Sequence, residues 1–166
     1  MATKKIISSM LNRKPGMIFS GVESETSFLQ NGVDIRLEFA KILVSLWSHA
    51  CMADGAFHAK EGTLVGEMVK ALFEPGSILS DYSETKDEIV DILSDIFDLP
   101  LPMKTILKVV EGNDQYALNF YEDALCIVST DGKLKKEERA FLDELALEFQ
   151  LNPIDKQELE KKYNLH

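Results

Sequence analysis

The chain has 166 residues, of which 45% are hydrophobic, and carries a formal net charge of −10. A chain of this length and apolar content can bury a compact core without the help of disulfides or metals. Its acidity argues against nucleic acid and anionic membrane surfaces as partners, because both repel a negatively charged protein. Cations and basic protein surfaces are the partners that the charge favours.

Residues 1–33 form an N-terminal arm whose structure the sequence does not define, apart from a short helix predicted at residues 4–11. The arm begins with Lys4 and Lys5, but Ser8 and Ser9 interrupt its apolar residues before the core of a signal peptide develops. The most apolar stretch, residues 42–47, is far shorter than the roughly 20 residues that span a bilayer. We therefore expect a soluble, cytoplasmic protein without membrane insertion.

The rest of the chain, residues 34–166, has the apolar spacing of an all-α domain. Apolar residues at helical spacing, with Gly and Pro between them, predict helices at residues 34–53, 59–73, 81–98, 103–110, 114–128, 136–149 and 153–163. No alternating pattern of useful strand length occurs. The expected fold is a compact bundle of about seven to eight helices, in which acidic connecting helices occupy residues 81–111.

The helix that begins at Asp34 is expected to be central, because Trp47 adds a second apolar face to its main stripe. The helix from residue 114 is expected to be more peripheral, because its second face presents Asn119, Glu122 and Asp123. Cys51 and Cys126 each lie within an apolar helix pattern, without a partner at metal-ligand spacing. We interpret both as buried thiols of a protein in a reducing compartment.

One segment of the sequence occurs twice. Asp54-Gly55 is followed by Glu61, and 77 positions later Asp131-Gly132 is followed by Glu138 in the same spacing. The apolar pattern continues beyond both motifs. Two copies of a helix-turn-helix unit, at about residues 34–73 and 114–149, explain this similarity and predict a pseudo-twofold arrangement.

Glycine favours the left-handed conformation that ends a helix, and Glu is favourable in the first turn of the next helix. The Asp residues are harder to explain, because a carboxylate at the C-terminal end of a helix meets the negative end of the helix dipole. Two kinds of group could compensate the negative charge of these Asp residues. The turn's own backbone amides are one, and a bound cation is the other.

The spacing of the motif matches four positions of an EF-hand calcium loop: a ligand Asp, a Gly, an apolar core anchor and a bidentate Glu. The apolar positions are Phe57 and Leu134. The candidate metal ligands are Asp54, Glu61, Asp131 and Glu138. The earlier carboxylates of an EF-hand loop are missing, so we expect at most weak binding of Ca²⁺ or Mg²⁺. His58 would add a nitrogen ligand suited to Zn²⁺ in the first copy only, since the second copy has Lys135 there.

The duplicated turn in an acidic all-α chain resembles the tellurite-resistance protein B (TerB) family. The segments that carry the resemblance are residues 127–153, and more loosely residues 50–61; together the matching parts cover residues 34–151. The resemblance implies a compact helical domain with internal pseudo-twofold similarity, whose repeated Asp and Glu residues are suspected cation ligands. It also implies a stress-associated role, or a role as an interaction module of co-chaperones.

The predicted helix at residues 81–98 is very acidic. Asp87, Asp91, Asp95 and Asp98 share one of its surfaces, where like charges repel one another. This surface is either a solvated face or a docking site for a partner with a basic surface. No nucleophile, phosphate loop or paired histidine motif supports catalysis. Two functions therefore stay open: a non-catalytic protein that binds divalent cations weakly, and a protein-interaction module with purely structural turns.

Overall fold

The computed structural model of the chain describes residues 29–30, 33–130 and 132–163. The predicted helix at residues 4–11 and the predicted ligand Asp131 lie outside the described residues. Within them, the fold is all-α, as the apolar spacing predicts.

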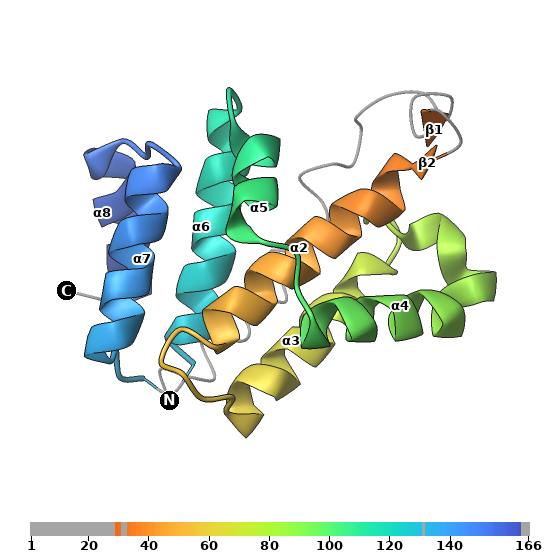
Figure 1. Ribbon diagram of the computed structural model, residues 1–166, viewed down its shortest axis with the longest axis horizontal. Coiled ribbons are helices and arrows are strands. Elements are labelled where there is room, and N and C mark those ends of the chain that lie inside the picture. Colours follow the sequence, from red (N-terminus) through yellow and green to blue (C-terminus); the bar gives the residue numbers. More distant parts are fainter. Residues whose placement is uncertain (1–28, 31–32, 131, 164–166) are drawn as a thin grey trace.

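Seven α-helices and one short 3₁₀ helix make up the described domain (Figure 1). They are α2 (Ile35–Cys51), α3 (Ala59–Leu72), η3 (Ser80–Thr85), α4 (Lys86–Asp98), α5 (Met103–Val110), α6 (Asp114–Val128), α7 (Lys136–Glu148) and α8 (Pro153–Lys162). The observed ends lie close to the predicted ends, because Gly and Pro separate the helices. One short element was not predicted, an antiparallel pair of two-residue strands, β1 (Leu29–Gln30) and β2 (Val33–Asp34). Asp34 therefore belongs to β2, and the first long helix begins one residue later.

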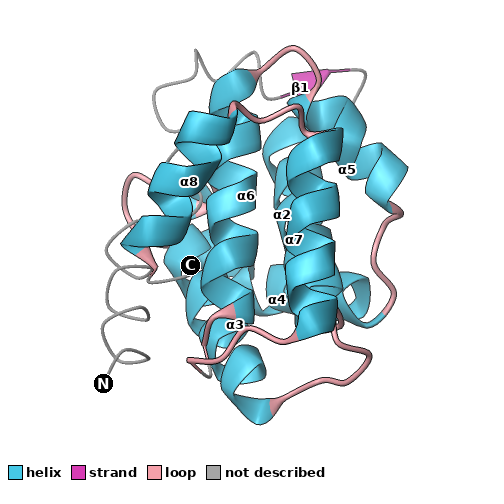
Figure 2. Ribbon diagram, turned by 90° about the vertical axis from the view of Figure 1, so that its left-hand side faces the viewer, coloured by secondary structure: helices cyan, strands magenta, loops and turns pink. Residues whose placement is uncertain are grey.

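Helix α2 lies at the centre of the domain, as predicted. It packs against α3, α4 and α5, and along its length against α6. Helices α7 and α8 pack against the other side of α6. Figure 1 shows α2 running between the α3 and α4 pair and the α6, α7 and α8 group, and Figure 2 shows α6, α7 and α8 on the side that faces the viewer. The largest buried side chain is that of Trp47, which is fully enclosed between α2 and its neighbours.

The acidic segment at residues 81–98 is two elements and not one helix, which corrects the prediction. The backbone leaves helical geometry at Tyr82, within η3, and again at Thr85, directly before α4 begins at Lys86. Arg36 of α2 holds this bend, because its Nη1 lies 2.7 Å from Asp81 Oδ2 and its guanidinium lies over the Tyr82 ring. A contact between residues so far apart in sequence is not visible in helical periodicity.

Helix α6 is also less peripheral than predicted. Glu122 and Asp123 are buried in the described structure, although their spacing suggested an exposed face. Trp47 Nε1 donates a hydrogen bond of 3.0 Å to Asp123 Oδ2, and Tyr163 Oη donates one of 2.7 Å to Glu122. Partners from distant segments allow these two carboxylates to be buried.

Three polar side chains of α2 hold the connection between α4 and α5. Ser48 Oγ donates to the carbonyl of Phe97 at 2.6 Å, and Ser45 Oγ accepts from the amide of Leu101 at 3.0 Å. His49 Nε2 lies 2.8 Å from the carbonyl of Leu101. These hydrogen bonds satisfy backbone groups that have no partner within a helix. They also fix the C-terminal end of α4 on α2.

None of the helices within the described ranges has the length and apolar character that a membrane crossing needs. Cys51 and Cys126 are buried, as predicted, and neither forms a disulfide in the structure.

Candidate functional site

The two Asp-Gly turns occupy equivalent places in the chain. The first turn, Asp54-Gly55, connects α2 to α3, and the second, Asp131-Gly132, connects α6 to α7. Gly55 has φ of 85° and Gly132 has φ of 78°, both in the left-handed region. The prediction that glycine reverses the chain at the end of each helix is confirmed.

The carboxylate of Asp54 is held by its own turn. Its Oδ1 accepts the backbone amide of Ala56 at 3.1 Å, and its Oδ2 lies 2.8 Å from His58 Nε2. Only 5% of the Asp54 side chain is exposed. A backbone amide of the turn was one of the two groups predicted to compensate the charge. The first copy has this hydrogen bond.

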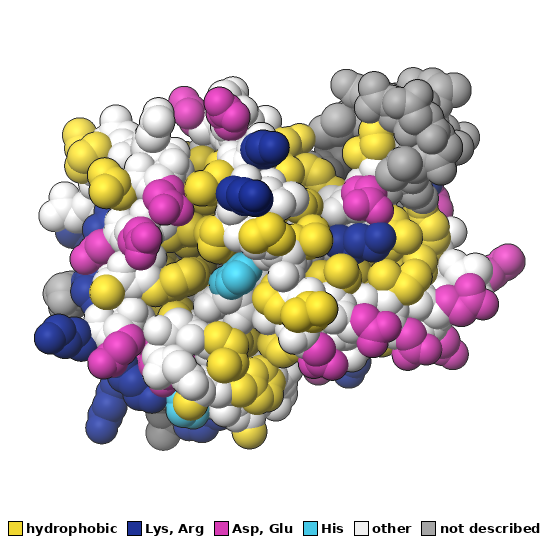
Figure 3. Space-filling model, in the orientation of Figure 1, with side chains coloured by type: hydrophobic (Ala, Val, Ile, Leu, Met, Phe, Trp, Pro, Cys, Tyr) yellow, Lys and Arg dark blue, Asp and Glu magenta, His cyan; other side chains and the backbone are white. Residues whose placement is uncertain are grey.

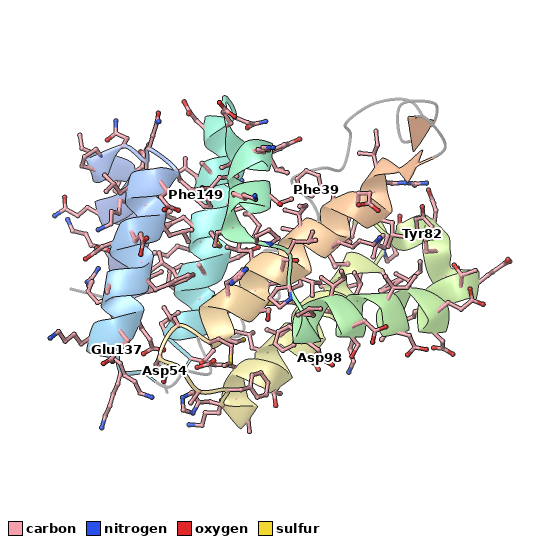
Figure 4. The ribbon with its side chains drawn as sticks, in the orientation of Figure 1. Phe39, Asp54, Tyr82, Asp98, Glu137 and Phe149 are labelled. Atoms are coloured by element: carbon pink, nitrogen blue, oxygen red, sulfur yellow. The ribbon has the colours of Figure 1, made fainter. Side chains whose placement is uncertain are left out.

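A cation also compensates Asp54, and it belongs to the protein. Lys135, which follows the second turn, places its Nζ 2.5 Å from Asp54 Oδ2 and 3.3 Å from His58 Nε2. Figure 4 shows Asp54 beside the start of α7, near the labelled Glu137. The segment that follows the second turn is therefore in direct contact with the first turn. This contact was not predicted from the sequence. The signal available for it was the position of Lys135 opposite His58 in the repeat.

These contacts shift the acid-base behaviour of both side chains. The hydrogen bonds from Lys135, His58 and the Ala56 amide hold the pKa of Asp54 well below its usual range. The hydrogen bond to Asp54 raises the pKa of His58 above its ordinary value, although desolvation and the neighbouring Lys135 charge oppose the shift. The group thus favours an ionised Asp54 and a protonated His58.

The predicted ligands Glu61 and Glu138 are both buried in the first turn of a helix. Glu138 Oε1 accepts the amide of Lys135 at 2.9 Å, which caps the N-terminus of α7. Glu61 forms a hydrogen bond with the thiol of Cys51, and burial together with this carboxylate raises the pKa of Cys51 strongly. Both Glu residues therefore have structural roles in the described residues.

The described ranges contain no group of three or more His, Cys, Asp or Glu side chains arranged to hold a metal ion. At Asp54 the position of a cation is taken by the Lys135 ammonium. Phe57, at the place of an EF-hand core anchor, is half exposed and so does not anchor the first turn in the core. Leu134 does pack against the core. Divalent-cation binding by the predicted set, which includes Asp131, stays a prediction.

A second candidate site lies along α4. Asp87, Asp91, Asp95 and Asp98 are all exposed, and no hydrogen bond or ion pair involves these four carboxylates within the described structure. Figure 3 shows a row of acidic side chains along this edge of the molecule, over α4 and η3. The prediction of a common acidic surface agrees with this placement.

An apolar groove runs beside this acidic row, between α3 and α4, with α2 beneath it. Its volume is about 490 Å³. Val44 of α2, Val65 of α3 and Leu93 of α4 contribute apolar surface to it. Its remaining lining residues are Phe57, Gly62, Gly66, Val69, Lys70, Lys86, Asp87, Val90, Ser94 and Phe97.

Two glycines inside α3 shape the groove. The ring of Phe57 lies over Gly62, so that a Cβ there would come within 2.6 Å of Phe57 Cζ. A Cβ on Gly66 would meet no atom within 4 Å, and the conformation of Gly66 does not require glycine. Glycine within a helix costs about 1 kcal/mol relative to alanine. Packing within the chain explains Gly62, but it does not explain Gly66.

Phe57 forms one end of the groove. Its ring meets that of Phe97 edge to face, with centroids 5.7 Å apart. The same two rings border a neighbouring hollow of about 540 Å³, which Met52, His49 and other residues line. Phe57 and Met52 are each about half exposed, at 50% and 48%. The apolar surface therefore continues from the groove around the end of α4.

No protein-family model, curated protein or solved structure matches this chain. The fold and the groove define a helical domain with an apolar groove beside an acidic helix.

Proposed function

We propose that the domain is a protein-interaction module whose α3–α4 groove binds an amphipathic, basic helix of a partner protein. The observation that carries the proposal is Gly66. This residue keeps the groove open at a cost in helix stability, and no contact within the described residues accounts for it. A ligand that occupies the space above Gly66 would account for it.

The chemistry of the groove supports a helical ligand. Helices commonly bind in apolar grooves through residues spaced three and four positions apart. Val65 and Val69 of α3 and Val90 of α4 offer such a ligand apolar side chains on both walls. Each buried methylene of the ligand would supply about 0.8 kcal/mol of favourable transfer free energy, against the entropic cost of association.

The charge beside the groove supports a basic ligand. Asp87 lines the groove, and Asp91 follows it one turn later along the same exposed side of α4. The basic residues at this end are partly compensated within the chain. Lys70 pairs with Glu67 at 3.3 Å, and Lys86 lies over the ring of Phe73. Lysine or arginine beside the apolar stripe of the ligand would therefore reduce the repulsion along α4.

The test uses two synthetic helical peptides of about 14 residues, long enough to fill a groove the length of α4. Both have leucine at positions that form one apolar stripe, and they differ only in lysine or glutamate at all other positions. Binding to the full chain is measured by titration calorimetry. The Leu/Lys peptide is expected to bind saturably and more weakly at high salt, and the Leu/Glu peptide is expected not to bind.

The matched variants are Gly66→Phe and Gly66→Ala. Phenylalanine would project into the groove, because a Cβ at this position meets no atom within 4 Å, and it is expected to weaken binding of the Leu/Lys peptide by about tenfold or more. Alanine adds a single methyl group to the groove, so it is expected to weaken binding measurably, but less than phenylalanine does. Equal binding by the wild type and both variants would refute the groove as the site, and equal binding of both peptides would refute the selection of a basic ligand.

We also propose that the two helix-turn-helix units are related by a pseudo-twofold axis, as the sequence repeat suggests. The support is local: His58 and Lys135 occupy matching positions in the two copies, and their nitrogens lie 3.3 Å apart. Residues near a twofold axis meet their own equivalents in this way. The resemblance to the TerB family, and the cation binding that it implies, stay predictions alongside this proposal.

A further inference from the structure

The chain itself contains a segment with the properties that the groove favours. Residues 1–22 include four basic residues, Lys4, Lys5, Arg13 and Lys14, and no acidic residue. The rest of this acidic protein has no comparable basic stretch free of carboxylates. Within it, Ile6, Ile7, Met10 and Leu11 recur at the spacing of one helix face, with Ser8, Ser9 and Asn12 opposite.

We infer that residues 4–14 bind the α3–α4 groove of the same chain and compete there with the partner helix. This inference rests on the proposed function of the groove, and it adds the regulation of that site. Ile6, Ile7, Met10 and Leu11 would lie against the apolar walls, and the basic residues would lie toward Asp87 and Asp91 of α4. The segment would then occupy the groove for part of the time in the free protein.

The dimensions fit. Eleven residues in helical geometry are about 16 Å long, and α4, which forms one wall of the groove, is about 20 Å long. Pro15 and Gly16 follow directly and would end a bound helix at this point. Both the charge and the length of residues 4–14 therefore fit the groove.

The connection is also long enough. The described chain begins at Leu29 and enters α2 at Ile35. Arg36, in the first turn of α2, pairs with Asp81, which lies just before the start of α4. The start of α2 is thus at the end of the groove that Lys86 and Asp87 line. Residues 15–28 can span at most about 50 Å, which exceeds the length of the groove.

Competition within one chain predicts a measurable cost for the partner. When a bound segment blocks the site for a fraction of the time, the apparent affinity for a second ligand falls in proportion to the open fraction. Loss of the segment should therefore increase the affinity for the Leu/Lys peptide, with no change in the groove itself.

The experiment compares two full-length double variants. Ile6→Asp with Met10→Asp places charge on the apolar face of the segment. Ser8→Asp with Ser9→Asp adds the same charge to the opposite face and is the matched control. Methyl NMR signals of Val65, Val69 and Val90 report on the groove, and calorimetry with the Leu/Lys peptide reports on competition.

We expect the apolar-face variant to shift these methyl signals and to bind the Leu/Lys peptide about tenfold more tightly than the wild-type chain. The control carries the same added charge without the change to the apolar face, so both effects should be clearly smaller in it. In a Gly66→Phe background, the apolar-face substitutions should no longer shift the methyl signals, because the segment cannot enter the filled groove.

Identical methyl signals in the wild type and the apolar-face variant would overturn the inference, whatever the peptide does. If the peptide still bound with a Gly66-dependent affinity, the proposed function would stand without this regulation. If the peptide bound none of the chains, the proposed function would fail, and the methyl signals alone would decide whether the segment occupies the groove.

Discussion

The ammonium of Lys135 lies 2.5 Å from the carboxylate of Asp54 and joins the two Asp-Gly turns of the chain. Asp54 follows the last turn of α2, where the helix dipole disfavours a negative charge. A lysine from beside the second turn supplies the compensating positive charge. Any divalent cation at Asp54 would have to displace it.

This contact leads to a prediction for metal binding. We expect Ca²⁺, Mg²⁺ and Zn²⁺ at millimolar concentration to leave the amide signal of Gly55 unchanged in the wild-type chain. In Lys135→Met the carboxylate of Asp54 loses its ammonium partner and keeps His58, so the same titration should shift the Gly55 signal, most strongly with Zn²⁺. Amide NMR of labelled protein measures both.

The matched control for this titration is Lys133→Met, which removes an exposed lysine near the same turn and should behave as the wild type. Saturable shifts at Gly55 in the wild-type chain would contradict the prediction. They would favour the cation-binding function that the TerB resemblance implies.

The dependence of stability on pH follows from His58. Its pKa is raised in the folded state by the hydrogen bond to Asp54. The protonated form therefore stabilises the fold fully below the unfolded pKa of about 6.5, and this contribution is lost as pH rises through the folded pKa. The wild type should lose stability between pH 6 and pH 8 relative to His58→Gln, as measured by urea unfolding at both pH values.

Asp54 makes stability depend on pH in the opposite direction. Its pKa is lowered in the folded state, so its contribution is present above the unfolded pKa of about 3.9 and is lost as pH falls below that value. Asp54→Asn should therefore be less stable than the wild type at neutral pH, and the difference should shrink in acid. A constant difference across this range would show that the ion pair does not contribute.

The two glycines of α3 provide a prediction for stability. Gly66→Ala should raise the free energy of unfolding by about 1 kcal/mol, because the helix gains propensity and the new Cβ meets no atom. Gly62→Ala should gain little or nothing. Its Cβ displaces the Phe57 ring from Phe97. Loss of this aromatic contact costs about 0.5–1.5 kcal/mol, which offsets the gain in helix propensity. Chemical denaturation of the two variants side by side measures the contrast.

Helical periodicity was sufficient to predict the α-helices and the left-handed glycines, because these depend on local spacing. It was insufficient where a distant segment decides the result. The bend at Tyr82 depends on Arg36, and the burial of Asp123 depends on Trp47. The candidate sites follow the same division. The acidic row of α4 is a property of one helix, whereas the contact between Asp54 and Lys135 and the groove beside Gly66 exist only after folding.

The buried pair of Trp47 and Asp123 leads to a further prediction. Trp47→Phe removes the indole N–H that donates to Asp123 Oδ2, and both side chains are almost fully buried. Loss of a hydrogen bond that a buried carboxyl group accepts should lower the free energy of unfolding by about 1–3 kcal/mol. Asp123→Asn retains an oxygen that accepts from Trp47 and should cost less. Equal losses in the two variants would contradict the prediction, because Asp123→Asn keeps the hydrogen bond that Trp47→Phe removes.

The two thiols provide the last prediction. Cys51 and Cys126 are at most 1% exposed, and burial together with Glu61 raises the pKa of Cys51 far from the range in which a thiolate forms. Because the thiolate is the reactive species, neither residue should react with an aromatic disulfide reagent at pH 8 while the chain is folded. Both should react in denaturant, and the slow reaction in buffer should depend on opening of the structure. Glu61→Gln should lower the pKa of Cys51, but the reaction should stay slow, because burial is the larger cause of the shift. Rapid modification of one thiol in the native wild type would show that the end of α2 or the end of α6 opens independently of the rest of the core.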